Sequence, residues 1–196
     1  LSTPEGATLA MRKVQCSVKD NAPVIYYFNG NMFSRIEGDP DRRLFHVEAM
    51  NIRACVTVKD PEKGTGWRLV SREVLFYMDP KTNEVLKTWE NPWTGKTVNV
   101  LHIDNDPVNQ PATFPVGRDG KPTAWRADMV GDSWWTTITV PLFYNNPLAG
   151  PYQKYIGGDY HATEMFSFMG DVSDLVNDKR DTAAVKVGWV RLSNWL

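Results

Sequence analysis

Runs of alternating apolar and polar residues, separated by Pro, Gly and Asn, constrain the fold of this chain more than any other feature. Residues 50–58 and 67–78 alternate with the period of two that a half-buried strand requires. Helical patterns are confined to residues 8–13 and 172–176. About eight to ten strands with turns at short spacing predict an all-β chain of antiparallel strands with few short helices.

Several turns and irregularities are predicted between these strands. Asn29-Gly30 predicts a tight hairpin turn between residues 24–28 and 32–36. A change of apolar parity within residues 44–58 predicts a bulge near Ala49 and Met50. Gly64 to Gly66 predict a turn, and the Pro- and Gly-rich residues 105–122 predict a long loop that acts as a lid. Further strands are expected at residues 84–89, 97–104, 133–142, 161–169 and 183–195.

The strand at residues 67–78 has an unusual pair of faces. One face is apolar, with Val70, Val74 and Phe76, and the other is mixed: Leu69, Ser71, Glu73, Leu75 and Tyr77. A strand of a barrel with a mixed interior produces this pattern, whereas a simple sandwich gives cleaner alternation. We therefore predict one domain over residues 1–196, an antiparallel β-barrel of the lipocalin or calycin type.

Charge and composition exclude several classes of partner. The net charge is -1 and the pI about 6.3, so no basic surface for nucleic acid is expected. No apolar run reaches the roughly 20 residues of a membrane-spanning helix. Leu1 suggests a processed or trimmed chain, and the compartment stays open between cytoplasmic and exported. Cys16 and Cys55 are predicted to be free, buried thiols, with one bridge between them as the alternative.

Polar groups gather after the apolar residues Val100 and Leu101. His102 is a candidate general acid/base, and Asp104, on the same face of an extended chain, would orient it. Asn109 follows the turn and would reach the same pocket mouth. The alternative makes His102 a hydrogen-bonded wall residue and Asp104 the cap of the following turn.

Two further carboxylates are candidate proton donors or acceptors. Arg72 and Glu73 point to opposite faces of their strand, so one of them is predicted to face the interior. Glu73 faces the interior if Leu75 and Tyr77 do, and Arg72 faces it if Phe76 does. Arg72 and Tyr77 are candidates to stabilise a developing oxyanion. Glu164 shares strand parity with Phe166 and Phe168, and a carboxyl among rings has a raised pKa. The alternative for Glu164 is a salt bridge to an arginine.

Aromatic residues are unusually frequent, with 8 Trp, 7 Tyr and 8 Phe, and they predict an aromatic-lined cavity. The candidate substrate-binding residues are Asp104, Asn109, Tyr27, Trp89, Trp134, Tyr144, His161 and Phe166. A metal held by His46, His102 and His161 is a weaker alternative, because no close His-x-His pair is present. No metal or cofactor is therefore predicted.

Four blocks of sequence resemble a family of bacterial and fungal proteins, the domain-of-unknown-function family DUF1838. They are residues 71–77, 89–95, 102–109 and 160–166, in an order that covers nearly the whole chain. The resemblance implies a strand content similar to calycin-type, lipocalin-like barrels. It also implies export signals in some members and relatives that continue beyond residue 196. It implies no activity, because the family is named for lacking one.

The sequence contains no phosphate-binding loop, dinucleotide fingerprint or nucleophile elbow. The leading hypothesis is a cofactor-independent lyase or isomerase acting on a small, apolar, aromatic molecule by retro-aldol cleavage or a proton shift. A non-catalytic carrier of a hydrophobic ligand is the second hypothesis, and a metal-dependent oxygenase is the third. Whether the chain forms a homo-oligomer is left open.

Overall fold

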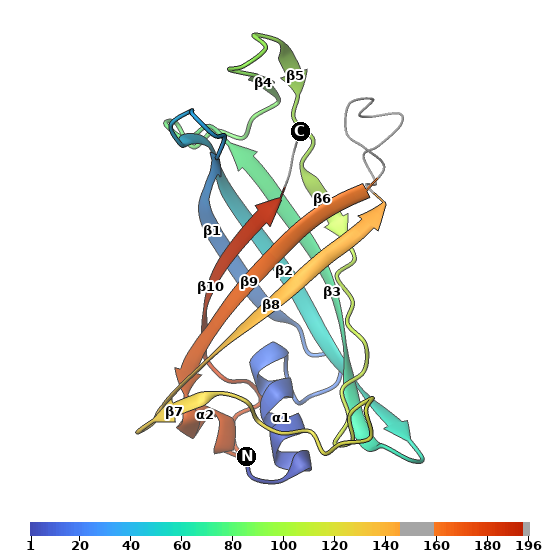
Figure 1. Cartoon of the computed structure of the whole chain (residues 1–196). Coiled ribbons are helices and arrows are strands. Elements are labelled where there is room, and N and C mark those ends of the chain that lie inside the picture. Colours follow the sequence, from blue (N-terminus) through green and yellow to red (C-terminus); the bar gives the residue numbers. More distant parts are fainter. Residues whose placement is uncertain (146–158, 194–196) are drawn as a thin grey trace. The chain divides into compact units, whose positions relative to one another are not determined.

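The computed structural model describes residues 1–145 and 159–193 (Figure 1). Strands dominate it, and α1 (Pro4–Gln15) and α2 (Val172–Val176) are the only helices in this part of the chain. The predicted all-β class with two short helices is confirmed. Contacts divide the chain into two compact units, one of Leu1–Val14 with Ala124–Leu196 and the other of Gln15–Thr123. The single domain expected from the sequence stays a prediction.

The unit Gln15–Thr123 contains a four-stranded antiparallel sheet. Its order is β1 (Val24–Ser34), β2 (Arg42–Asp60), β3 (Gly64–Met78) and β6 (Ile103–Asp106). The long strands predicted over residues 44–58 and 67–78 are confirmed. A separate hairpin of β4 (Thr88–Glu90) and β5 (Thr97–Asn99) replaces the longer strands predicted over residues 84–89 and 97–104.

The predicted hairpin turn at Asn29-Gly30 is wrong. Strand β1 runs straight through these residues, and Gly30 pairs with Val47 of β2. The chain reverses instead at residues 35–41, where Gly38 has a φ of 80°. Pairing along the whole of β2 supplies more hydrogen bonds than a local turn would, so tertiary pairing overrides the turn propensity.

The other two local predictions are also corrected. The register shift between β1 and β2 lies at Met32/Phe33, not near Ala49 and Met50. The turn between β2 and β3 lies at residues 61–63, because Asp60 accepts hydrogen bonds from the N–H groups of Glu62 and Lys63, both at 2.9 Å. Gly66 belongs to β3 instead, where a Cβ would collide with the carbonyl oxygen of Thr113.

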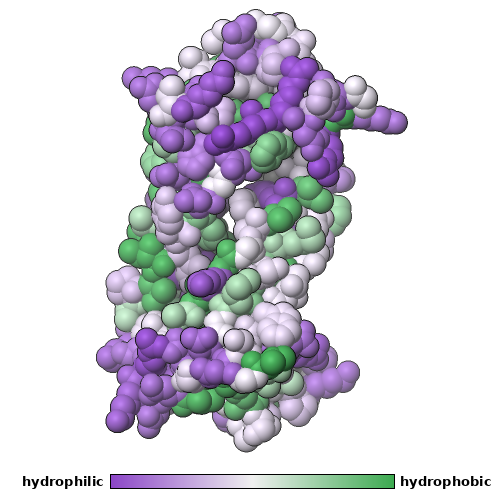
Figure 2. Space-filling model, turned by 90° about the vertical axis from the view of Figure 1, so that its left-hand side faces the viewer, coloured by the Kyte–Doolittle hydropathy of each residue, from purple (hydrophilic) through white to green (hydrophobic). Residues whose placement is uncertain are grey.

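The two faces of this sheet differ in burial. Strand β1 alternates between half-buried and exposed side chains along its whole length. The more buried face is the mixed one predicted from β3, and it includes Leu69, Ser71, Glu73, Leu75 and Tyr77. The other face exposes large apolar side chains, among them Ile25, Ile52 and Phe76. Exposed hydrophobic residues are visible on the side of the molecule drawn in Figure 2.

The segment after β6 follows the edge of β3. Gln110 N–H donates to Leu69 O at 3.2 Å, and Thr113 and Trp67 exchange two backbone hydrogen bonds of 2.8 and 2.9 Å. Residues 107–123 are mostly irregular, as predicted, but these bonds tie residues 110–113 to the sheet. The lid predicted here is therefore not supported.

The unit containing residues 124–196 holds the second sheet. Its order is β10 (Val185–Ser193), β9 (Asp159–Asp171), β8 (Ser133–Asn145) and β7 (Asp128–Val130), all antiparallel. The strands predicted over residues 133–142, 161–169 and 183–195 are confirmed apart from their ends. Within the described residues neither sheet closes on itself, so the predicted barrel is not confirmed.

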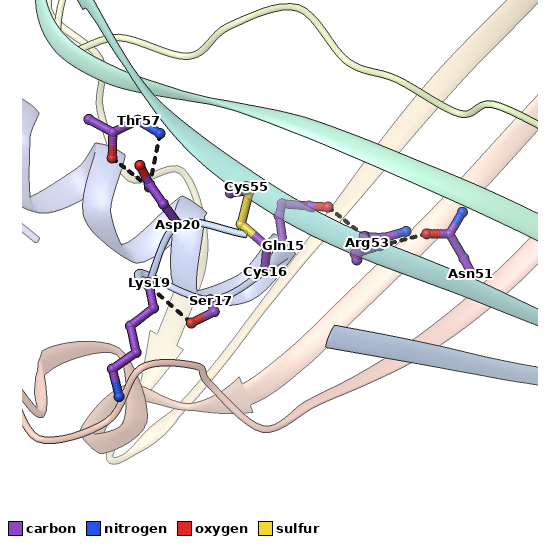
Figure 3. Close-up of a disulfide and its surroundings, with 9 residues drawn as sticks. All are labelled: Gln15, Cys16, Ser17, Lys19, Asp20, Asn51, Arg53, Cys55 and Thr57. Carbon is purple, nitrogen blue, oxygen red and sulfur yellow. Dashed lines mark hydrogen bonds between the residues drawn. A yellow bond between two sulfur atoms is a disulfide. The ribbon is translucent and has the colours of Figure 1, made fainter. Parts of the chain in front are cut away.

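The predicted free thiols are wrong, because Cys16 and Cys55 form a disulfide with a Cα–Cα distance of 5.9 Å (Figure 3). Both cysteines have exposed fractions of 0%. A separation of 39 residues gave no indication that they meet. The pairing of β2 with its neighbours and the fold of residues 15–21 bring them together.

We expect this disulfide to stabilise the fold by about 3 kcal/mol, because it closes a long loop in the unfolded chain. Reduction should therefore lower the midpoint of urea unfolding, measured by tryptophan fluorescence. The double variant Cys16→Ser/Cys55→Ser is the control, and its midpoint should not respond to the reductant. A wild-type midpoint unchanged by complete reduction would contradict the prediction.

Candidate functional site

A row of polar side chains crosses the buried face of the first sheet. Tyr26 of β1 pairs with Asn51 of β2, and Asn51 pairs with Glu73 of β3. In the next row along the same face, Arg53 of β2 pairs with Ser71 of β3. Directly opposed residues have Cβ atoms roughly 5 Å apart. These five side chains therefore form one cluster, which we call the polar row.

Asn51 is the centre of the polar row and has an exposed fraction of 1%. Its amide nitrogen donates to Glu73 Oε2 at 3.2 Å and to Ser71 Oγ at 3.4 Å. Its amide oxygen accepts a hydrogen bond of 2.8 Å from Arg53 Nε. One neutral amide thus connects a carboxylate to a guanidinium by a hydrogen bond to each.

Arg53 also lies over the ring of Tyr26, with the guanidinium carbon 4.1 Å from the ring centroid. Burial raises the pKa of the Tyr26 phenol, and the positive charge of Arg53 opposes this rise. Burial lowers the pKa of Arg53, and the charges of Tyr26 and Glu73 oppose that effect. The phenol is therefore held as a neutral donor beside a cation, an arrangement that suits a ligand oxygen carrying negative charge.

Ser71 connects the polar row to the segment after β6. Its hydroxyl donates to Val108 O, and its backbone N–H donates to Asn109 Oδ1 at 3.2 Å. Asn109, predicted to bind substrate, is exposed and holds this edge of the sheet. Of the predicted residues, Glu73 lies in the polar row and Asn109 lies beside it.

His102 makes two backbone hydrogen bonds. Nδ1 accepts from Tyr77 N–H at 3.1 Å, and Nε2 lies 2.8 Å from Leu86 O, which it can only approach as a donor. Both ring nitrogens are thereby engaged, as in the wall-residue alternative. The geometry gives no support to a proton shuttle at His102.

The other residues predicted near this sheet lie apart from the polar row. Arg72 is exposed and donates to Ser71 O, and Asp104 is exposed on β6. Tyr27 lies on the opposite face of β1, with 58% of its surface exposed. Tyr77 is on the same face as Glu73, but its ring packs edge-on against Phe45 at 5.4 Å. Trp89 also packs on Phe45, at 5.2 Å.

The second sheet contains a half-buried carboxylate, Glu164. Glu164 lies on the face of β9 that also carries Phe166 and Phe168, whose rings stack at 5.9 Å. Burial raises the pKa of Glu164, while the charge of Arg191 and a hydrogen bond from Trp189 oppose the rise. Arg191 Nη1 lies 3.5 Å from Glu164 Oε1. The raised pKa and the arginine salt bridge, predicted as alternatives, thus occur together.

The remaining predicted residues belong to the same unit. Trp134 has an exposed fraction of 1%, and its ring packs edge-on against Trp125 at 5.2 Å. No described residue accepts a hydrogen bond from either indole N–H. His161 is exposed, with its ring 5.2 Å from Phe143. The side chain of Tyr144 lies outside the described residues.

The described residues contain no group of three or more His, Cys, Asp or Glu side chains that could hold a metal ion. The three-histidine site considered from the sequence therefore has no support here. A half-open cavity of about 390 Å³, with Lys63, Phe114 and Arg118 in its wall, is separate from the polar row. Its lining residues include none of the predicted site residues.

Sequence reasoning missed four members of the polar row as site residues: Tyr26, Asn51, Arg53 and Ser71. The change of apolar parity in β2 was the signal that could have found Asn51 and Arg53. It was interpreted as a bulge, but β2 keeps its register with β3 across residues 46–60, so Asn51 and Arg53 stay on the buried face. Polar residues at buried positions of a strand are candidates for a site.

Comparison with protein families gives one match. The model of the family described as a protein of unknown function, DUF1838, matches residues 21–196. The chain belongs to the DUF1838 family. The match includes every residue of the polar row in this DUF1838 chain. Comparisons of the DUF1838 chain with curated proteins and with solved structures found no match.

No helix in the described part of this DUF1838 chain has the length and apolar character needed to span a membrane.

Removing the Asn51 amide should destabilise the fold. Asn51→Ala removes the hydrogen-bonding partner from Arg53 Nε and from one Glu73 oxygen at half-buried positions, so we expect a loss of about 2 kcal/mol in the free energy of unfolding. Asn29→Ala, at an exposed position of β1, is the matched control and should change it by less than about 0.5 kcal/mol. Equal effects of the two substitutions in urea titrations would contradict the role of Asn51.

The raised pKa of Glu164 predicts a pH dependence of stability. The folded state keeps this proton to higher pH than the unfolded state, so the stability contributed by Glu164 is complete below its unfolded pKa. It is lost as the pH rises through the folded pKa. Glu164→Gln abolishes this titration, so the free energy of unfolding of the wild type minus that of the variant should fall as the pH rises above the ordinary Glu pKa of about 4.3.

Denaturant titrations at several pH values measure this difference. Asp128→Asn, at an exposed position in β7 of the same sheet, is the control. A difference for Glu164→Gln that stays constant or rises with pH would refute the assignment.

Proposed function

We propose that the chain is a cofactor-independent lyase or isomerase that acts on a small, largely apolar and aromatic molecule. The single observation that carries the proposal is the polar row, where Glu73 lies near a half-buried phenol and a guanidinium on one sheet face. Glu73 is the proton acceptor and donor, and Tyr26 with Arg53 stabilises the developing negative charge. Asn51 positions the two sides relative to each other.

For a β-hydroxy ketone, the proposed cleavage runs as follows. Glu73 takes the proton of the hydroxyl group, the carbon–oxygen double bond of an aldehyde forms, and the carbon–carbon bond breaks. The electron pair of that bond moves to the ketone fragment, which becomes an enolate. Tyr26 O–H and the Arg53 guanidinium bind the enolate oxygen, and the protonated Glu73 returns its proton to carbon.

A double-bond shift uses the same groups. Glu73 removes a proton from the carbon next to a carbonyl, the enolate forms against Tyr26 and Arg53, and the proton returns at a different carbon. No electron acceptor or cofactor is required in either reaction. Apolar and aromatic neighbours on the same face, such as Phe28 and Leu75, support a substrate with an aromatic or apolar body.

The polar row changes the assignment of roles made from the sequence. Both ring nitrogens of His102 are engaged with the backbone, so Glu73 takes the proton-transfer role. Tyr26 and Arg53 take the oxyanion role that the sequence suggested for Tyr77 and Arg72. We also propose a lipocalin-like barrel in which this face forms part of the interior wall.

A non-catalytic carrier is the second candidate function. It is favoured by the mutual satisfaction of the polar row, where Asn51 and Gln15 both accept hydrogen bonds from Arg53. A carrier needs Tyr26 and Arg53 as a polar anchor for the ligand, but it needs no proton transfer at Glu73. The two functions therefore differ in what Glu73→Gln does.

The test uses an aryl β-hydroxy ketone whose cleavage releases a fluorescent naphthaldehyde, and an aryl β,γ-unsaturated ketone for the double-bond shift. If the wild type converts either compound, Glu73→Gln should lower kcat by about 10²- to 10⁴-fold with little change in binding. Arg72→Gln, at the adjacent exposed position, is the matched control and should keep wild-type kcat.

Native mass spectrometry of protein purified from its source gives the second readout. A retained aromatic molecule that binds equally to the wild type and Glu73→Gln, and that the wild type never converts, would contradict the proposed enzyme and support the carrier function.

A further inference from the structure

Gln15 contacts the polar row from outside the sheet. It is the last residue of α1, and its side-chain Oε1 accepts a hydrogen bond of 2.9 Å from Arg53 Nη1 (Figure 3). Gln15 precedes the residues matched by the family model, which begin at position 21. Its contact with Arg53 is therefore a property of this chain that the family assignment does not describe.

The segment after Gln15 is fastened to β2 by several interactions. Cys16 forms the disulfide with Cys55, and Asn21 N–H donates to Cys55 O at 2.9 Å. Asp20 Oδ1 accepts hydrogen bonds from the backbone N–H and the hydroxyl of Thr57, at 2.9 and 2.7 Å. The disulfide is the interaction nearest to Gln15 in the chain, and it holds Gln15 close to Arg53.

Two acceptors define the orientation of the Arg53 guanidinium. Nε donates to Asn51 and Nη1 donates to Gln15, so the planar group is fixed at two of its nitrogens while it lies over Tyr26. Arginine has a long side chain with many rotamers, and one hydrogen bond alone leaves rotation about it. Without Gln15, Asn51 would be the one hydrogen-bond acceptor among the described residues left to orient the group over the Tyr26 ring.

We propose that Gln15, held against β2 by the Cys16–Cys55 disulfide, is a positioning residue that fixes the Arg53 guanidinium over the Tyr26 ring. Its consequence for turnover rests on the proposed function, whereas its effect on Arg53 and Tyr26 does not. The disulfide then has a second role besides stability, because it links the end of α1 to the geometry of the polar row.

The first experiment follows the ionisation of the Tyr26 phenol by ultraviolet absorbance, isolated as the difference between each protein and its Tyr26→Phe counterpart. Because the charge of Arg53 lowers the pKa of this phenol, releasing Arg53 should raise it. Gln15→Met keeps the size of the side chain without the oxygen. We expect this substitution to raise the pH midpoint of the Tyr26 ionisation. An unchanged or lowered midpoint in Gln15→Met overturns the proposal.

Two further variants separate positioning from general loosening. Asp20→Ala breaks the Thr57 contacts of the same segment without removing a partner of Arg53, so the Tyr26 midpoint should stay at the wild-type value. Cys16→Ser/Cys55→Ser should raise the midpoint as Gln15→Met does, while an unchanged midpoint in the folded double variant overturns the role of the disulfide. If the double variant does not fold, Gln15→Met decides.

Turnover supplies the second readout, with the same fluorogenic β-hydroxy ketone. Gln15→Met should lower kcat/KM about tenfold, and Gln15→Glu, which keeps an oxygen acceptor, should restore most of it. If the wild type converts the ketone but Gln15→Met changes neither kcat/KM nor the Tyr26 midpoint, positioning fails and the proposed function stands. If the midpoint rises while the wild type has no activity, the proposed function fails and positioning stands.

Discussion

The hydrogen bonds of the Asn51 amide are the interaction on which the site depends. A guanidinium and a carboxylate on the more buried face of a sheet are unfavourable unless each charge is compensated. Asn51 compensates both, with its oxygen toward Arg53 and its nitrogen toward Glu73. Because Asn51 is itself buried, its own polar groups also require these partners, so the three residues hold one another in place.

The proposed function depends on the charges and the burial of the polar row. Arg53 and Glu73 carry opposite charges, so the cluster adds no net charge to the buried face. Tyr26 remains a neutral donor because burial disfavours its ionised form. In the proposed function, these groups serve as the base, the hydrogen-bond donor and the cation on one face of the sheet.

The second sheet also places a carboxylate beside an arginine, but the two groups contact each other directly. Glu164 and Arg191 pair across neighbouring strands, and Trp189 donates a hydrogen bond to the carboxylate. No amide separates the two charges there, and stacked phenylalanine rings lie on the same face. Both sheets thus place a half-buried carboxylate near an arginine, and the first sheet combines the pair with the phenol of Tyr26.

The sequence by itself determined the all-β class, the long strands and which residues share a strand face with Glu73, because strand periodicity is local and survives in any context. Which of the two faces is the more buried one was left to the tertiary structure. Only the tertiary structure decided that β1 continues through Asn29-Gly30, that Cys16 meets Cys55 and that Tyr26 and Arg53 join Glu73. Each of these depends on which distant strand a segment pairs with. Pairing is set by hydrogen bonds and burial between residues far apart in the chain, which no local pattern records.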